Sequence, residues 1–110
     1  MTAAIDAAFG ALADPHRRRA VELLCSKPHS AGELAQALGV SAPTMSKHLR
    51  HLRAARLVEE RHPEFDARVR IYSLSSERLS LVRDWLAAAE TMWVEQLSAF
   101  KRHIESDAGA

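Results

Sequence analysis

Residues 30–54 read SAGELAQALGVSAPTMSKHLRHLRA, and the spacing of capping and apolar residues in this segment is the strongest indication of the fold. Ser30 and Glu33 have the spacing of a capping box, in which a hydroxyl and a carboxylate satisfy free backbone N–H groups at a helix start. Leu34 and Leu38 then supply one apolar face. The pattern predicts a short helix that begins just after Ser30.

A second helix is predicted directly after the first. Gly39 is suited to the left-handed position that ends a helix, and Ser41 can cap the next one. Pro43 is tolerated in the first turn of that second helix, where its missing N–H has no partner to lose. Two short helices joined by a tight turn predict a helix-turn-helix over about 30–54.

The second helix is expected to have a buried face and a basic outer face. At 100° per residue, Met45, Leu49 and Leu52 fall together on the core side. The outer side collects Pro43, Lys47, Arg50 and Ala54, flanked by Thr44 and Ser46. No Asp or Glu occurs from residue 41 to 56. Such a helix can enter the major groove of DNA, because cations neutralise phosphates and small hydroxyl side chains permit close approach to base edges.

Two helices are predicted before this motif. Ile5, Phe9 and Leu12 recur at helical spacing, so residues 1–13 are expected to form an amphipathic helix. A further helix is expected from Pro15 to about residue 26, with Asp14 as its cap.

Within the helix predicted from residue 15, two features carry specific expectations. Cys25 lies one turn after Val21 on the apolar side, so it is expected to be buried. Of the consecutive arginines 17–19, Arg17 or Arg18 is a candidate phosphate contact.

The pattern changes after the basic helix. Residues 58–61 and 69–74 predict two strands of a hairpin, so residues of about 57–74 would form a wing. A last helix is predicted from about residue 76 to 106, roughly 45 Å long. The expected fold is therefore mainly α with a small β-hairpin, a single winged helix-turn-helix domain over 1–110.

The last helix carries two adjoining apolar stripes. Together they form an apolar arc that is too broad to be covered by one neighbouring element. One stripe is expected to seal the monomer, and the other, with the first helix, to form a two-fold dimer interface over about 1–13 and 76–106. A monomer with a folded-back tail is the alternative. The interface candidates are Ile5, Phe9, Trp85, Met92, Trp93 and Phe100.

Composition limits the class of protein. The chain has 110 residues, 47% hydrophobic and 26% charged, as in ordinary globular domains. No long apolar run or secretory leader is visible, so neither a membrane partner nor export is expected. The single cysteine excludes an intrachain disulfide or a cysteine-cluster metal site and favours a cytoplasmic location. No catalytic motif is present, so no enzyme and no cofactor are expected.

Charge is distributed unevenly. Residues 15–56 hold eight Lys or Arg against two Asp or Glu, whereas residues 71–110 hold four against six. The first segment is suited to an anionic partner, which favours double-stranded DNA.

The stretches FGALADPHRRRAVELL, SAGELAQALGVSAPTMSKHLRHLRAARLVEERH and RVRIYSL resemble the ArsR/SmtB-type winged helix-turn-helix repressors over about two-thirds of the chain. The long last helix resembles a metal-independent branch of that family. The resemblance implies a homodimer and DNA contacts from the basic helix, with wing contacts near Arg68 and Arg70. The helix positions implied are Ala42, Pro43, Thr44, Ser46 and Lys47.

The sequence departs from the family pattern at two places. The wing tip, residues 62–66, is bulky and acidic where many members have a glycine-rich basic tip, so Arg68 and Arg70 are weaker candidates than Lys47. Residues 33–38 lack the paired cysteines of the usual sensing site, so that metal site is absent.

Other interpretations stay open at this point. Cys25 could be a redox switch, and His48 with His51 could bind a metal, although a structural role is favoured for each. His103 and Glu105 point in different directions and indicate a solvated tail. A winged-helix protein-interaction module is the rival function, and a small-molecule or protein effector remains unidentified.

Overall fold

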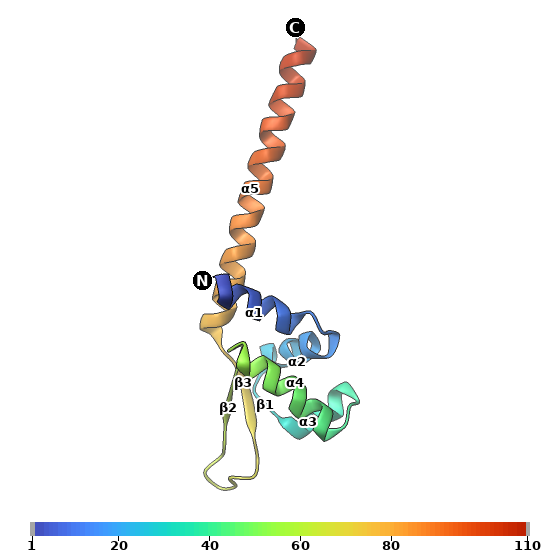
Figure 1. Ribbon diagram of the computed structural model, residues 1–110, viewed down its shortest axis with the longest axis vertical. Coiled ribbons are helices and arrows are strands. Elements are labelled where there is room, and N and C mark those ends of the chain that lie inside the picture. Colours follow the sequence, from blue (N-terminus) through green and yellow to red (C-terminus); the bar gives the residue numbers. More distant parts are fainter. Residues whose placement is uncertain (1, 110) are drawn as a thin grey trace.

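The computed structural model describes residues 2–109, which form five helices and a three-stranded sheet (Figure 1). The order is α1 (Thr2–Leu12), α2 (Pro15–Ser26), β1 (His29–Ser30), α3 (Ala31–Leu38), α4 (Ala42–Ala54), β2 (Val58–Arg61), β3 (Ile71–Leu74) and α5 (Ser76–Gly109). The predicted winged helix-turn-helix architecture is confirmed.

The predicted capping residues begin three of the helices. Asp14 accepts hydrogen bonds from the backbone nitrogens at the start of α2. Ser30 and Glu33 form the reciprocal capping box of α3, with N–O distances of 2.9 and 3.1 Å. Ser41 Oγ accepts from the backbone nitrogen of Thr44 at 3.2 Å. Short-range sequence signals therefore fix these helix starts.

Gly39 sets the turn between α3 and α4. Its φ of 68° lies in the left-handed region, which glycine adopts without a steric cost. The Gly39 N–H donates to the carbonyl of Gln36, and the Val40 N–H donates to that of Ala35. These bonds end α3 sharply and fix the direction in which α4 leaves.

The sheet contains one strand that the sequence pattern did not predict. The strand order is β1-β3-β2, antiparallel throughout, and β1 pairs His29 with Tyr72. Two residues are too few to show the alternating pattern by which a strand is recognised in a sequence. β1 is a strand because its backbone pairs with β3. The predicted hairpin of β2 and β3 is confirmed, with Glu60 opposite Tyr72.

One core joins all five helices to the sheet. The largest fully buried side chains are Leu34, Met45, Leu49, Leu52, Leu57 and Tyr72. Val82 connects the first part of α5 to this core. In α4, the three apolar residues predicted to face inward are all buried.

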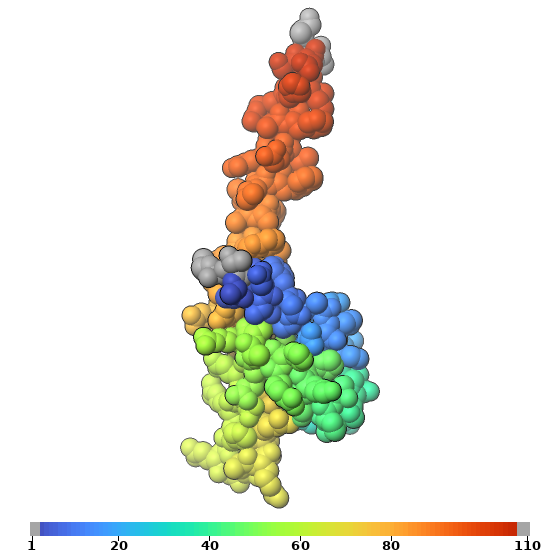
Figure 2. Space-filling model, viewed as in Figure 1, coloured from blue at the N-terminus to red at the C-terminus, as the bar shows by residue number. Residues whose placement is uncertain are grey.

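Beyond the core, α5 extends away from the body (Figures 1 and 2). The structure measures 75 × 26 × 23 Å, and its radius of gyration is 19.9 Å, against about 13 Å for a compact chain of this length. Val82 is the last buried residue among the α5 side chains that the structure describes. The helix does not fold back, so the folded-back tail is not observed.

Within residues 2–109, no helix combines the length and the apolar character that a membrane span requires.

The prediction that Cys25 is buried is wrong, because its side chain is exposed. The buried residues of α2 are Ala20, Val21 and Leu24. At 100° per residue Cys25 lies about 90° from the centre of that group, and it occupies the last turn, where the core ends. One turn of spacing from a buried residue was therefore not sufficient evidence of burial.

Candidate nucleic-acid interface

The outer face of α4 is accessible along its whole length. Because the apolar side of α4 packs into the core, the opposite side must face solvent. The exposed predicted residues are Ala42, Pro43, Thr44, Lys47 and Arg50. The structure thus brings these five candidates together on one surface.

The cations of α4 differ in their availability. Arg53 Nη1 donates to Glu60 Oε2 at 2.8 Å, so its charge is neutralised within the chain. Lys47 and Arg50 take part in no ion pair among the described residues. These two side chains therefore carry the uncompensated positive charge of the face.

Ser46 lies at the edge of this face, half-buried, and is in contact with the wing. Arg70, just before β3, donates from Nη2 to Ser46 Oγ at 2.9 Å. The Arg70 guanidinium also lies 6.0 Å from the ring centroid of Tyr72. Arg70 is thus held against α4. Two residues predicted to contact DNA, Ser46 in the helix-turn-helix and Arg70 in the wing, therefore lie side by side.

The wing tip presents different chemistry. Asp66 Oδ1 accepts from the backbone nitrogen and from Nε of Arg68, at 2.9 and 3.2 Å. These two hydrogen bonds hold the pKa of Asp66 below its ordinary value. Phe65 is 87% exposed at the same tip. Arg68 is therefore accessible, but its charge is already paired with an acid.

A polar cluster behind α4 connects the helix to both strands of the wing. Glu60 accepts from Tyr72 Oη at 2.9 Å and from Arg53, and it lies 3.1 Å from His62 Nε2. Burial raises the pKa of Glu60, but the Tyr72 hydrogen bond and the nearby Arg53 charge outweigh it, so the pKa is lowered overall. The wing is therefore fixed relative to α4 by an ionised carboxylate.

Sequence reasoning missed this cluster. The sequence gives no signal for it, because Glu60 and Tyr72 face each other only in the strand register that the folded hairpin adopts.

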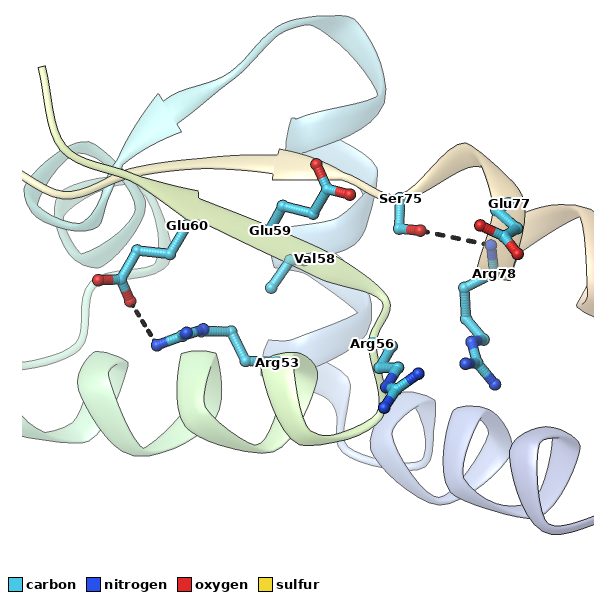
Figure 3. Close-up of a pocket in the computed structure, with 8 residues that line it drawn as sticks. All are labelled: Arg53, Arg56, Val58, Glu59, Glu60, Ser75, Glu77 and Arg78. Carbon is cyan, nitrogen blue, oxygen red and sulfur yellow. Dashed lines mark hydrogen bonds and ion pairs between the residues drawn. The ribbon is translucent and has the colours of Figure 1, made fainter.

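A cleft of about 420 Å³ lies where α4, β2 and α5 meet (Figure 3). Arg56 and Arg78 extend to the same side of β2 in this view, while Arg53 reaches Glu60. Arg56 has a φ of 59°, a left-handed conformation that is unusual for a residue with a side chain. The cleft is at the end of α4 remote from Thr44, so it is not part of the exposed basic face.

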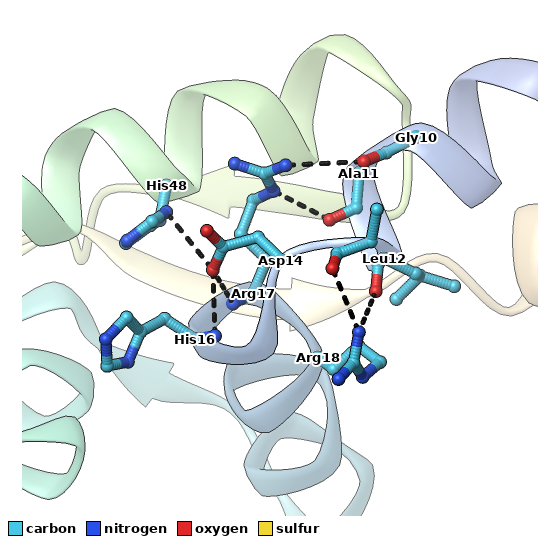
Figure 4. A network of polar contacts seen from close by, with 9 residues as sticks. Gly10, Ala11, Leu12, Asp14, His16, Arg17, Arg18 and His48 are labelled. Atoms are coloured by element: carbon cyan, nitrogen blue, oxygen red, sulfur yellow. Dashed lines mark hydrogen bonds and ion pairs between the residues drawn. The ribbon is translucent and has the colours of Figure 1, made fainter.

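Arg17 and Arg18 have a structural role (Figure 4). Arg17 Nε donates to the carbonyl of Ala11 at 2.6 Å, and Arg18 Nη1 donates to that of Leu12 at 2.9 Å. Both guanidiniums thus satisfy carbonyls at the end of α1, where backbone acceptors lack helical partners. The prediction that one of them contacts phosphate is not supported by this geometry.

His48 faces the interior and His51 faces solvent, so the two do not form a site. His48 Nδ1 lies 4.0 Å from Asp14 Oδ1 (Figure 4). Burial lowers the pKa of His48, and the Asp14 carboxylate offsets part of that effect. Across residues 2–109, no group of three or more His, Cys, Asp or Glu side chains is placed to hold a metal ion.

The predicted dimer residues fall into two groups. Phe9 and Trp85 pack edge to face within the chain, with ring centroids 5.2 Å apart, and Ile5 is half-buried nearby. Met92, Trp93 and Phe100 stand on the free part of α5 and are 62–65% exposed. The first group therefore joins α1 to α5, and only the second is fully available to a partner.

A winged helix with an exposed basic second helix defines a class of DNA-binding transcriptional regulators. Comparison with known proteins supports that class. Residues 14–60 match the model of "Bacterial regulatory protein, arsR family". The HTH-type transcriptional regulator Rv2034 of Mycobacterium tuberculosis is 38% identical over 102 residues, which are 93% of this chain and 90% of that protein. The chain belongs to the arsR family of bacterial regulatory proteins.

Two further similarities are informative. The transcriptional repressor SdpR of Bacillus subtilis is 35% identical over 52 residues, 47% of this chain and 58% of that protein. The solved ArsR-like transcriptional regulator from Rhodococcus sp. RHA1 has a TM-score of 0.76 at 30% identity, covering 92% of each chain. Similarity to the solved structure therefore extends over nearly the whole fold.

Proposed function

We propose that this chain is a transcriptional repressor that binds an inverted-repeat operator as a homodimer and reads it with α4. The observation that carries this proposal is the exposed outer face of α4, which combines small polar side chains with uncompensated cations. Phosphates attract the cations, and the small side chains leave room for base edges. The similarity to SdpR, which is named a repressor, supports the direction of regulation.

Each residue of the interface has a distinct role in this proposal. Lys47 and Arg50 contact phosphates and set affinity, while the base-reading side consists of Ala42, Pro43, Thr44 and Ser46. Arg70 reaches the same DNA segment from the wing, beside Ser46. Arg68 contacts phosphate at the wing edge when it leaves Asp66, at some cost in affinity.

The domain divides accordingly. Residues 30–54 read the DNA, residues 57–74 form the wing, and residues 1–13 and 76–106 form the dimer interface. A homodimer would present two copies of α4 to half-sites about one helical turn apart. It would act in the cytoplasm, where a single reduced cysteine is stable.

Regulation does not require the cysteine pair of a metal-sensing family member. Residues 33–38 contain no cysteine, and α3 is an ordinary capped helix. We therefore place the chain in a metal-independent branch. The signal is then an organic effector, a protein partner or the repressor concentration itself. Metal sensing through histidine and redox sensing through the exposed Cys25 are the alternatives.

The test is fluorescence anisotropy on DNA from upstream of the chain's own gene, across a salt series, with zinc or with a chelator. Saturable binding that exceeds binding to random DNA and is unaffected by zinc is expected. Zinc-dependent release would instead support the histidine alternative. Weak, equal binding to both DNAs would contradict autoregulation, and selection from a random pool would then distinguish another operator from a protein-binding winged helix.

A further inference from the structure

The cleft between the end of α4, β2 and the start of α5 holds two arginines that have no partner in the chain (Figure 3). Among residues 2–109, Arg56 and Arg78 take part in no ion pair and donate no side-chain hydrogen bond. The third arginine of the cleft, Arg53, is paired with Glu60. The cleft volume of about 420 Å³ lies within the range of small-molecule sites, about 300–1,000 Å³. Two guanidiniums in a cleft of this size are therefore free to bind an anion.

Arg56 is held in the cleft by a backbone conformation that does not favour arginine. Its N–H donates to the carbonyl of Arg53 at 2.9 Å, and the N–H of Leu57 donates to the carbonyl of Leu52 at 3.0 Å. These two bonds end a helix at a residue in the left-handed region, which is usually glycine. The strain of a φ of 59° is similar in size to the favourable interaction of a cation with a helix end. Stability alone therefore does not select an arginine here, which points to a function of its side chain.

Backbone contacts bring the second arginine to the first. The N–H of Ser75 donates to the carbonyl of Leu57, the residue after Arg56, at 2.9 Å. Ser75 Oγ accepts from the backbone N–H of Arg78 at 3.4 Å, in the first turn of α5. Both guanidiniums extend to the same side of β2 (Figure 3). Planar guanidiniums match the paired oxygens of a carboxylate or a phosphate, so this arrangement suits an oxyanion.

The acidic side chains of the cleft limit the size of the ligand. Glu59 lies on the opposite side of β2 from Val58 and Glu60, because side chains alternate along a strand (Figure 3). Glu77 is exposed in the first turn of α5. These two carboxylates would repel a long polyanion such as the DNA backbone. A small anion can contact the two guanidiniums and remain clear of both acids.

We propose that this cleft binds a small organic anion, with a carboxylate or phosphate group held between Arg56 and Arg78. The cleft would be the effector site of the repressor, and this part of the inference rests on the proposed function. Arg53 connects the cleft to the wing, because it also holds Glu60, the carboxylate that fixes the wing relative to α4. An anion in the cleft would compete with Glu60 for Arg53. It would thereby loosen the wing and weaken operator binding.

Isothermal titration calorimetry without DNA tests the site, with succinate and inorganic phosphate as the probes at constant ionic strength. We expect saturable binding of at least one probe at one site per chain, weakened at least about tenfold in Arg56→Gln and in Arg78→Gln. Glutamine has a Cβ, so Arg56→Gln keeps the backbone strain and removes only the guanidinium. Arg19→Gln is the matched control, because it removes another exposed arginine from outside the cleft. It is expected to bind the probe as the parent chain does.

Two results would overturn the site. One is the absence of saturable binding of either probe up to about 10 mM. The other is equal weakening in all three variants, which would show that the probe responds to the overall charge of the chain. Circular dichroism confirms that each variant is folded. Binding of phosphate without succinate, or the reverse, would support the site and identify the group that the ligand carries.

Fluorescence anisotropy on operator DNA tests the effector role. At constant ionic strength, a saturating probe is expected to weaken operator binding by the parent chain about fivefold and to have no effect on operator binding by Arg56→Gln. An equal effect on both chains would indicate competition for the DNA-binding face and would overturn the effector role, and so would no effect on the parent chain. A parent chain that binds the probe but no operator would overturn the proposed repressor, while the calorimetric result for the cleft would stand.

Discussion

Arg70 and Ser46 are 24 residues apart in sequence and share a hydrogen bond of 2.9 Å between the wing and α4. Arginine only donates, so it occupies an acceptor position of the Ser46 hydroxyl. The hydroxyl proton must then point elsewhere, and on this edge of α4 it can donate to a base acceptor such as guanine N7 or O6. In the proposed DNA complex, the wing would thereby constrain which base acceptors Ser46 can contact.

Replacing Arg70 by methionine is expected to weaken operator binding about tenfold, because a hydrogen bond from a charged group and the fixed orientation of Ser46 are both lost. Fluorescence anisotropy on operator and random DNA measures the effect. Arg68→Met is the matched control: it removes the same charge two residues away, from a guanidinium that is paired with Asp66 and has no contact with Ser46 among the described residues. Equal losses in the two variants would contradict a special role for Arg70.

Lys47→Ala and Thr44→Val are expected to differ in kind. In the proposed complex the lysine variant would lose one phosphate contact, so it should bind all sequences more weakly and lower the salt slope by about 1. The valine variant keeps the shape of Thr44 but loses its hydroxyl, so it should change base preference at one position. Selection from a random pool, followed by salt titration, measures both. The same loss on operator and random DNA for the two variants would refute this division of roles.

His48 is expected to make stability depend on pH. Its folded-state pKa lies below the ordinary value of 6.5, so the unfolded chain binds the proton more readily. The contribution of neutral His48 to stability is therefore fully present above about pH 6.5, and it is lost as the pH is lowered towards the folded-state pKa. Urea unfolding of His48→Gln between pH 5.5 and 8 should show a flatter profile than the parent chain.

The control for this profile is His51→Gln, on the same helix but exposed. It is expected to change the profile much less than His48→Gln does, because burial lowers the pKa of His48 more than the nearby charge of His51 does. A profile that flattens in the His51 variant and not in the His48 variant would show that the assignment is wrong.

Arg56 occupies a position at which glycine is expected to be more stable. Its φ of 59° costs a residue with a Cβ about 1 kcal/mol, and glycine avoids this cost. Arg56→Gly should therefore unfold at a higher urea concentration than Arg56→Ala. The free energy of unfolding should be higher by about 1 kcal/mol, measured at equal protein concentration. Both variants remove the guanidinium, so their difference isolates the backbone. An alanine variant of equal or greater stability would contradict the argument.

The helices and their starts were predictable because their signals are local. Asp14, Ser30 and Ser41 each bond to backbone nitrogens within three residues, and Gly39 acts through its own backbone conformation. The outer face of α4 was predictable for a similar reason. Once the apolar spacing shows which side of a helix is buried, the residues on the opposite side must face solvent.

The interactions that sequence reasoning missed all join distant segments. β1 exists only because β3 pairs with it, and Tyr72 meets Glu60 only once the hairpin has formed. The sequence made Arg17 or Arg18 a candidate phosphate contact, because it did not show the α1 carbonyls to which both guanidiniums donate in the fold. A charged side chain near a DNA-binding motif therefore indicates that it has a partner group. The sequence does not tell whether that group is a phosphate or a carbonyl or carboxylate of the chain itself.

The long uncovered half of α5 bears on how sharply such a regulator responds to its own abundance. While dimers are scarce, their number rises with the square of the chain concentration, so a twofold rise in synthesis gives about a fourfold rise in the species that holds two half-sites. A repressor of its own gene would then cross from little occupancy to high occupancy over a narrow range of expression. In the proposed dimer the same exposed tryptophan and phenylalanine are covered by the partner, so dilution that separates the two chains would release the operator.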